Sequence, residues 1–299
     1  MEFKEFTEEI RRHLAERNDK LDISIQTVRK NNSVQYTGVS IRSIPEDAAP
    51  IIYLEPYYRL FKDTADMEKV IDEIIRVYEQ NNFRFNPNEI CDFSLVKDKI
   101  VYTVINEHRN KDLLKEVPHR CLVDDIAVTY KILLGHSGDG MSASIRVNNH
   151  LMELWSAKEE MLWTFAETNT NRLQKPMYIG LEELIKGMLS GEHLASSGFT
   201  KKNINYTGLE MFVATNEEKL NGASVMADKV FMKKLQSEIG DFYIIPSSIH
   251  EIIVVPASGE FEVDAISNML RDVNSTVLSE EDYLSDIVYK YDGEMITVA

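Results

Sequence analysis

The stretch GDFYIIPSSIHEIIVVP, residues Gly240 to Pro256, contains two runs of strongly β-forming residues separated by a Pro-Ser-Ser turn. The runs Phe242–Ile245 and Ile252–Val255 are rich in aromatic and β-branched side chains, which favour strands. Proline follows each run, and it cannot donate a hydrogen bond to a neighbouring strand. The segment therefore predicts a buried pair of strands that presents polar residues at the turn between them.

Hydrophobic periodicity in the rest of the chain switches between helical and extended patterns. Apolar residues three or four positions apart indicate amphipathic helices, and strict alternation indicates half-buried strands. By these criteria we expect helices at 3–18, 67–80, 92–107, 157–167, 181–189, 227–239 and 263–273, a helix beginning at Pro56, and strands at 23–28, 34–41, 51–54, 126–134, 141–147, 210–215, 287–291 and 295–298. Ser156 and Glu159 form a capping-box pattern for the helix at 157–167. The predicted fold class is α+β, with mixed, largely antiparallel sheets covered by helices.

The pattern of elements changes around residue 118, from helices and a hairpin to a longer series of strands and helices. We therefore expect two subdomains, a helix, hairpin and helix unit at 1–118 and a larger acidic α+β unit at 119–299. Residues 1–118 carry 18 basic and 22 acidic groups (18 − 22 = −4), whereas 119–299 carry 15 and 27 (15 − 27 = −12). Ser190–Asn205 is rich in small and polar residues, which predicts a loop that tolerates deletion.

Composition disfavours several classes of function. A formal net charge of −16 disfavours direct binding of nucleic acid, because Lys and Arg supply that affinity by neutralising phosphates. The first residues do not have the pattern of a secretory signal, and no stretch reaches the roughly 18 apolar residues of a membrane span. Two cysteines, Cys91 and Cys121, are too few for a disulfide framework. We expect a cytoplasmic protein that does not enter a membrane.

The turn between the two β-forming runs supplies the candidate catalytic residues, which are Ser247, Ser248, His250 and Glu251. A serine nucleophile, a histidine base and an orienting carboxylate are the groups that acyl transfer requires. Neighbouring residues of an extended chain point to opposite faces, however, so His250 and Glu251 do not both face Ser248 without a partner from elsewhere. A hydroxyl-stabilised turn is the favoured interpretation.

A second candidate is a ligand-binding site at His119 and Arg120, because a guanidinium binds an anion in a two-pronged geometry. The competing interpretation is a surface linker that enters a strand. The acidic residues after Ser279 have the pattern of a helix start rather than of a calcium loop. We predict no metal site and no cofactor.

Several strings resemble a known family of uncharacterised proteins. They include SIQTVRKNNSVQYTGVSIR, IIYLEPYY, TNEEKLNGASVMAD, DFYIIPSSIHEIIVVP and LSDIVYKYD. The family is a domain of unknown function from anaerobic Gram-positive bacteria, and the resemblance covers nearly the whole chain. Residues 150–299 also resemble a second uncharacterised bacterial family. The resemblance implies a bacterial cytosolic protein, encoded on a mobile element in one interpretation, and brings no catalytic residue with it.

These observations favour a non-enzymatic interaction or regulatory module that binds a protein partner. One alternative is a hydrolase in which Ser248 and His250 act with a distant acid and with Arg120. The other is an acidic mimic of nucleic acid that acts on a basic host or defence protein. The sequence does not predict the oligomeric state.

Overall fold

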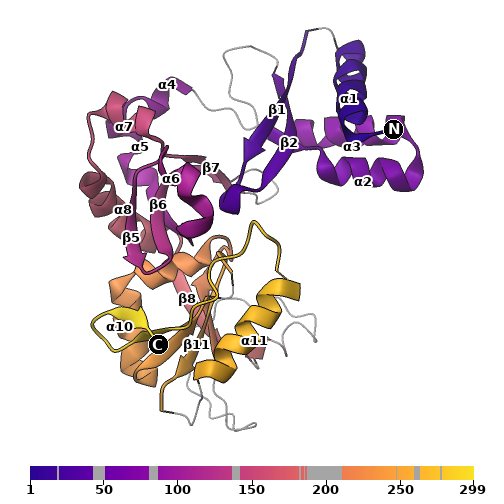
Figure 1. Cartoon of the computed structure of the whole chain (residues 1–299). Helices are drawn as coiled ribbons and strands as arrows, with labels where there is room; N and C mark the ends of the chain where they lie inside the picture. The colour runs from indigo at the N-terminus through magenta and orange to yellow at the C-terminus, as the bar shows by residue number, and fades with distance from the viewer. Residues whose placement is uncertain are drawn as a thin grey trace.

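Three sheets organise the chain, and in all three the paired strands run antiparallel. The computed structural model describes residues 1–18, 20–42, 51–80, 87–136, 142–181, 183, 184, 186, 211–246, 248–258, 263–276 and 278–299. Helices cover the sheets, which confirms the predicted α+β class. The three sheets follow one another along the chain and divide it into an N-terminal, a central and a C-terminal part (Figure 1).

The N-terminal part contains one three-stranded sheet and three helices. Its elements are α1 (Phe3–Arg17), β1 (Asp22–Arg29), β2 (Gln35–Arg42), β3 (Ile51–Tyr53), α2 (Glu55–Thr64) and α3 (Met67–Gln80), and the strand order is β1-β2-β3. The apolar stripe of α1, Phe6, Ile10 and Leu14, is buried against residues of β2 and α3 such as Val39 and Ile71. The predicted amphipathic helix and hairpin are confirmed.

The central part contains a second sheet with helices before and after it. Its elements are α4 (Pro87–Ile90), α5 (Phe93–Val96), β4 (Ile100–Asn106), α6 (Lys111–Leu114), β5 (His119–Val123), β6 (Ile126–His136), β7 (Ser142–Arg146), α7 (Asn149–Trp155) and α8 (Glu159–Leu173). The long strand β6 pairs with β4, and its successive halves pair with β5 and β7. Tyr102, Tyr130 and Ile132 point from this sheet into a core that also contains Leu162 of α8.

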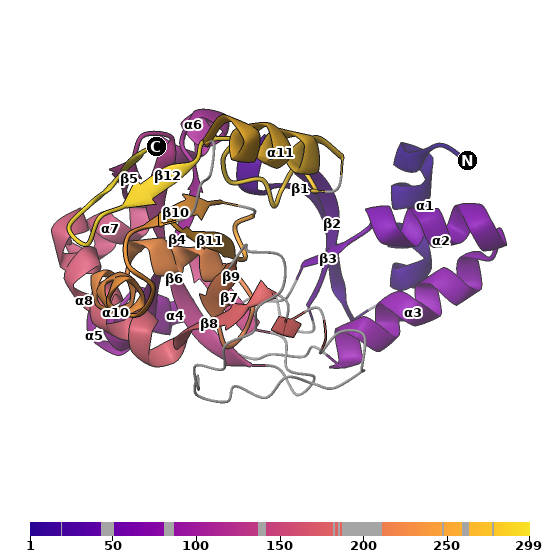
Figure 2. The same ribbon diagram turned by 90° about the horizontal axis from the view of Figure 1, so that it is seen from below.

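The C-terminal part contains a six-stranded sheet in the order β13-β12-β10-β11-β9-β8. Its elements are β8 (Pro176–Gly180), β9 (Phe212–Asn216), α10 (Lys229–Ile239), β10 (Phe242–Ile245), β11 (Ile252–Pro256), α11 (Val263–Thr276), β12 (Tyr289–Tyr291) and β13 (Ile296–Val298). Phe231 and Leu235 of α10 pack with Phe242, whereas Leu270 of α11 packs with Val255. The two helices therefore cover opposite faces of the sheet (Figure 2). The predicted pairing of the two β-forming runs is confirmed.

The expected helix at 92–107 is wrong. Only the short helix α5 forms, and Ile100–Asn106 is strand β4, paired along its whole length with β6. The run IVYTVI is buried on both faces, so its apolar residues satisfy a helical stripe and a strand equally well. Its β-branched and aromatic content favours the strand.

The predicted capping box at Ser156 is also wrong. Ser156 adopts a left-handed conformation (φ 50°) and ends α7, while Lys158 precedes α8 and makes no side-chain cap. Helix α8 then continues to Leu173, six residues beyond the expected end at 167. The capping-box motif marks a boundary between two helices here rather than the start of one.

Residue 118 does not separate two cores. Strands β4 and β6 lie on either side of it and pair in one sheet, and one hydrophobic core contains residues from Val96 to Tyr291. The core of the N-terminal part contains no residue after Tyr78. The division at 118 stays a prediction about folding units, and the observed change of core between Tyr78 and Ile90 does not favour it.

Asparagine side chains join the three parts at one place. Asn110, which follows β4, donates to the side chain of Asn31 at the tip of the β1–β2 hairpin (3.0 Å). Asn32 donates to the carbonyl of Tyr283 (2.7 Å), and Asn106 donates to the buried carboxylate of Asp125 (2.8 Å). The hairpin tip is thus held by both the central and the C-terminal parts.

The predicted loop Ser190–Asn205 lies outside the described residues, and so does most of the expected helix at 181–189.

Candidate functional site

Ser248 lies in the turn between β10 and β11, and its hydroxyl is committed to that turn. The side chain is buried, its Oγ donates to Oε1 of Glu251 (2.7 Å), and it accepts from the backbone N–H of His250 (3.0 Å). A hydroxyl that bonds its own chain two residues later is a common turn-stabilising pattern. The contacts of Ser248 are therefore those of a turn residue, and the imidazole of His250 is not among its partners.

His250 uses both ring nitrogens in contacts with other segments. Nδ1 accepts from the backbone N–H of Asn221 (3.1 Å), which assigns the ring proton to Nε2. Nε2 then donates to Oδ1 of Asp282 (3.0 Å). A general base needs a nitrogen lone pair directed at the group that it deprotonates. In this arrangement the only ring lone pair, on Nδ1, already accepts a hydrogen bond from the backbone N–H of Asn221.

Close packing fixes the backbone of the same turn. The carbonyl of His250 accepts from the hydroxyl of Thr215 (2.7 Å), and Gly222 lies against it. A Cβ added at Gly222 would lie 2.5 Å from that carbonyl oxygen and 2.8 Å from the amide nitrogen of Asn216. No side chain fits there. Ser247, the fourth candidate of this group, lies outside the described residues.

Arg120, on β5, is held by a side chain of the central part rather than directed at solvent. Its guanidinium donates two hydrogen bonds to Glu159 of α8 (2.7 and 2.6 Å) and stacks on the ring of Trp163 (4.2 Å to the centroid). Tyr130 also donates to Glu159. The pKa of Glu159 stays below its usual value because these donors outweigh its burial, which acts in the opposite direction. An external anion would have to displace Glu159.

His119 lies beside Arg120 but does not join it in a site. Its Nδ1 is within hydrogen-bond distance of the carbonyl of Val117 (3.0 Å), and the residue as a whole is exposed. Adjacent strand residues point to opposite faces, and β5 follows this rule. His119 nevertheless acts electrostatically on Glu159, the carboxylate that Arg120 binds, and the predicted ligand-binding pair stays a prediction.

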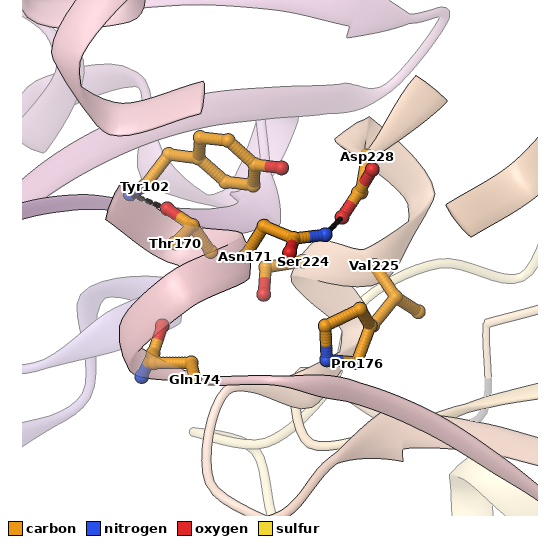
Figure 3. Close-up of a pocket in the computed structure, with 8 residues that line it drawn as sticks. All are labelled: Tyr102, Thr170, Asn171, Gln174, Pro176, Ser224, Val225 and Asp228. Carbon is orange, nitrogen blue, oxygen red and sulfur yellow. Dashed lines mark hydrogen bonds between the residues drawn. The ribbon is translucent and has the colours of Figure 1, made fainter. Parts of the chain in front are cut away.

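A small polar cavity lies between β4, α8 and the segment before α10 (Figure 3). Its volume is about 10 Å³, at the lower limit for one water molecule. The lining residues are Tyr102, Thr170, Asn171, Gln174, Pro176, Ser224, Val225 and Asp228. Within the described ranges, the hydroxyl of Tyr102 and both amide atoms of Gln174 are buried and have no hydrogen-bond partner. Buried polar groups normally have partners, so this cavity fits one bound water molecule.

Sequence reasoning missed the cavity residues and also Lys131, which lies at the centre of β6. Lys131 is only 9% exposed. The signal that marks it is visible in the sequence, because a lysine interrupts the otherwise apolar run YKILL. Tyr102 and Gln174 give no such signal, since each resembles an ordinary core or helix-end residue.

Among the described residues, no group of three or more His, Cys, Asp or Glu side chains is arranged to hold a metal ion. None of the helices in the described ranges is both long and apolar enough to cross a membrane.

The model of one protein family matches residues 3–293, almost the whole chain. The chain belongs to a family of unknown function (DUF5688). The expected membership in a domain of unknown function is thereby confirmed, whereas the Gram-positive origin and the second family remain predictions. No curated protein and no solved structure matches the chain. Membership in DUF5688 assigns no residue a role, so the function has to be argued from the geometry.

Proposed function

We propose that this member of DUF5688 is a non-enzymatic binding module. The observation that carries the proposal is the state of the turn before β11, where the fold already uses the functional atoms of both Ser248 and His250. A catalytic serine needs a base within hydrogen-bond reach, and the base needs a free lone pair. Here the histidine accepts from Asn221 and the serine donates to Glu251.

The hydrolase alternative requires the same turn to rearrange. His250 would have to release the backbone N–H of Asn221 and rotate its ring toward Ser248. Gly222, packed against the carbonyl of His250, and Thr215, bonded to it, oppose that movement. The His250–Asp282 contact on its own resembles an orienting pair, but it engages Nε2, so the other nitrogen would have to serve as the base.

The proposal includes a bacterial, cytoplasmic setting. Cys91 and Cys121 are both exposed and unbonded, as is usual in a reducing compartment. The acidic mimic of nucleic acid stays an alternative prediction. No contact among the described residues specifically supports it.

Labelling with a fluorophosphonate probe tests the non-enzymatic proposal. Such probes form a covalent bond only with a serine whose oxygen is activated by a base. We expect the wild type and Ser248→Ala to give the same background labelling, measured by intact-protein mass spectrometry. Labelling of the wild type that maps to Ser248 and disappears in both Ser248→Ala and His250→Ala would contradict the proposal and establish the hydrolase.

A further inference from the structure

Two cationic side chains lie directly opposite each other on neighbouring strands of the central sheet. Lys131 of β6 and Arg146 of β7 are Cα partners in the antiparallel register. Residues in this position project from the same face with Cβ atoms about 5 Å apart, and like charges so placed repel each other. This face is opposite to the one that carries Tyr130 and Ile132 into the core.

The two cations differ in burial, because Lys131 is buried and Arg146 is exposed. Lys131 is 9% exposed, and burial lowers its pKa to about 8; Arg146 lowers it further, while Glu218 acts in the opposite direction. Arg146 keeps accessible surface, yet the surrounding protein removes enough water to lower its pKa as well. A buried cation is costly unless an anion is placed against it.

The described part of the chain does not place an anion in contact with this pair. Within those residues, no carboxylate lies within 4.0 Å of the charged group of Lys131 or of Arg146. Glu116 acts on Arg146 from a distance but forms its ion pair with Arg29 (3.1 Å). In a chain of net charge −16, two cations without an ion-pair partner among the described residues are unusual.

The N-terminal part contributes an aromatic residue near Arg146 and a lysine that lies over that aromatic ring. Tyr53 of β3 interacts electrostatically with Arg146, and the ammonium of Lys30 lies over the ring of Tyr53 (4.4 Å to the centroid). Tyr36 of β2 packs against Tyr53, with ring centroids 5.3 Å apart. Residues from the N-terminal and central parts of the molecule thus meet at Arg146.

We propose that Lys131 and Arg146 form a binding site for a small oxyanion, a phosphate or carboxylate group presented by the ligand of this protein. The inference rests on the proposed binding function and specifies the chemistry of what is bound. The guanidinium of Arg146 offers parallel N–H donors that match two oxygens of such a group, and the ammonium of Lys131 adds a point charge. Lys30 and Tyr53 form one border of the site.

Thermal unfolding in matched salts is the test. The wild type is compared in sodium phosphate, sodium malonate and sodium chloride at equal ionic strength and at pH 7. A bound anion stabilises the folded state by mass action, so we expect a rise of about 2 °C or more over chloride at millimolar anion. A rise in phosphate alone identifies a phosphate site, and a rise in malonate alone identifies a carboxylate site. Equal unfolding temperatures in all three salts overturn the proposal.

Variants assign the effect to the pair. Arg146→Gln, at an accessible position, should fold and lose the anion-dependent rise. Lys131→Met should lose it too, and in chloride it should unfold at the same temperature as the wild type or higher, because a desolvated charge is replaced by an apolar side chain of similar shape. Lys115→Met and Arg11→Gln, at exposed ion pairs, are the matched controls and should keep the rise. A rise that persists in Arg146→Gln overturns the proposal, even where Lys131→Met does not fold.

The pH dependence of the rise gives a second readout. The charged groups that act on Lys131 are Arg146 on β7 and Glu218 in the segment after β9. Only the protonated amine attracts an anion, so the anion-dependent rise should shrink as the pH increases through about 8. A rise that is unchanged between pH 7 and pH 9.5 contradicts the role of Lys131.

The non-enzymatic module and the oxyanion site can be disproved independently, because different experiments test them. Absence of an anion effect without fluorophosphonate labelling removes the oxyanion site and leaves the non-enzymatic module. Labelling of Ser248 together with an anion effect removes the non-enzymatic module and leaves the oxyanion site, then as a substrate-binding element.

Discussion

The turn at Ser248–Glu251 and the cation pair Lys131–Arg146 are opposite cases of polar groups beside a sheet. At the turn, Ser248 has hydrogen-bond partners within the turn, and His250 has partners in other parts of the chain. At the cation pair, the described residues offer neither side chain an ion-pair partner. The sequence of the turn is the more suggestive of catalysis, but its polar atoms are used in hydrogen bonds that stabilise the fold. The pair is marked in the sequence only by the lysine in an apolar strand, and its charges have no ion-pair partner among the described residues.

The comparison separates polar groups that stabilise the fold from those that remain available to a ligand. Removing a satisfied group leaves its partners buried without hydrogen bonds and lowers stability. Removing an unsatisfied cation relieves a cost that the folded state bears. Stability measurements on matched variants therefore test the distinction directly, and three of them follow in order of expected effect.

The largest effect is expected for Gly222→Ala, which crowds the satisfied turn. The added methyl group would overlap the hydroxyl of Thr215 and approach the carbonyl of His250. Because the obstacles are mainly backbone atoms, the turn must shift, and we expect a loss of about 3 kcal/mol in the free energy of unfolding. Chemical denaturation measures it.

Gly180→Ala is the matched control for that variant, since a Cβ at Gly180 meets no atom within 4 Å. It should change stability by less than about 0.5 kcal/mol. Equal stability of the two variants would mean that the turn is loosely packed, and the argument against the hydrolase would lose its support.

An intermediate effect is expected for His250→Ala. The substitution removes the acceptor of the Asn221 N–H and the donor to Asp282, and we expect a loss of about 2 kcal/mol. His150→Ala, at an exposed position of α7, should be nearly neutral by comparison. If His250→Ala were neutral or stabilising, His250 would belong with the unsatisfied groups, and the turn would become the better candidate site.

The smallest effect is expected at the polar cavity. Its polar groups are satisfied if a water molecule is bound and unsatisfied if none is. With a water molecule in the cavity, Gln174 is satisfied, and Gln174→Leu should lower the unfolding free energy by about 1 kcal/mol. If the cavity is dry, the amide of Gln174 is buried without a hydrogen-bond partner, and the same substitution should raise the free energy of unfolding. The sign of the change in the unfolding midpoint decides between the two.

Periodicity predicted most of the elements but failed where two patterns coincide. The stripes of α1 and α3 are one-sided, so burial of one face determines the structure. Strand β4 is buried on both faces, and its residues fit a helix equally well on spacing alone. Ser156 fits a cap but adopts a left-handed conformation, which depends on how α7 and α8 meet.

Residue types indicated where polar groups gather but not what they contact. Asp282 and Asn221 complete the surroundings of His250 from 32 and 29 positions away, and Glu159 holds Arg120 from 39 positions away. Such partners depend on tertiary packing, which periodicity does not describe. Lys131 is the exception, because a lysine in an apolar strand is already improbable as a solvated surface residue.

The pKa of Lys131, followed by NMR of its side chain with and without sodium phosphate, tests the central claim most directly. The account predicts titration near pH 8 in chloride, depressed by burial and by Arg146, and a clear increase when phosphate is present. An ordinary lysine pKa in chloride, or a depressed value that phosphate does not change, would contradict it.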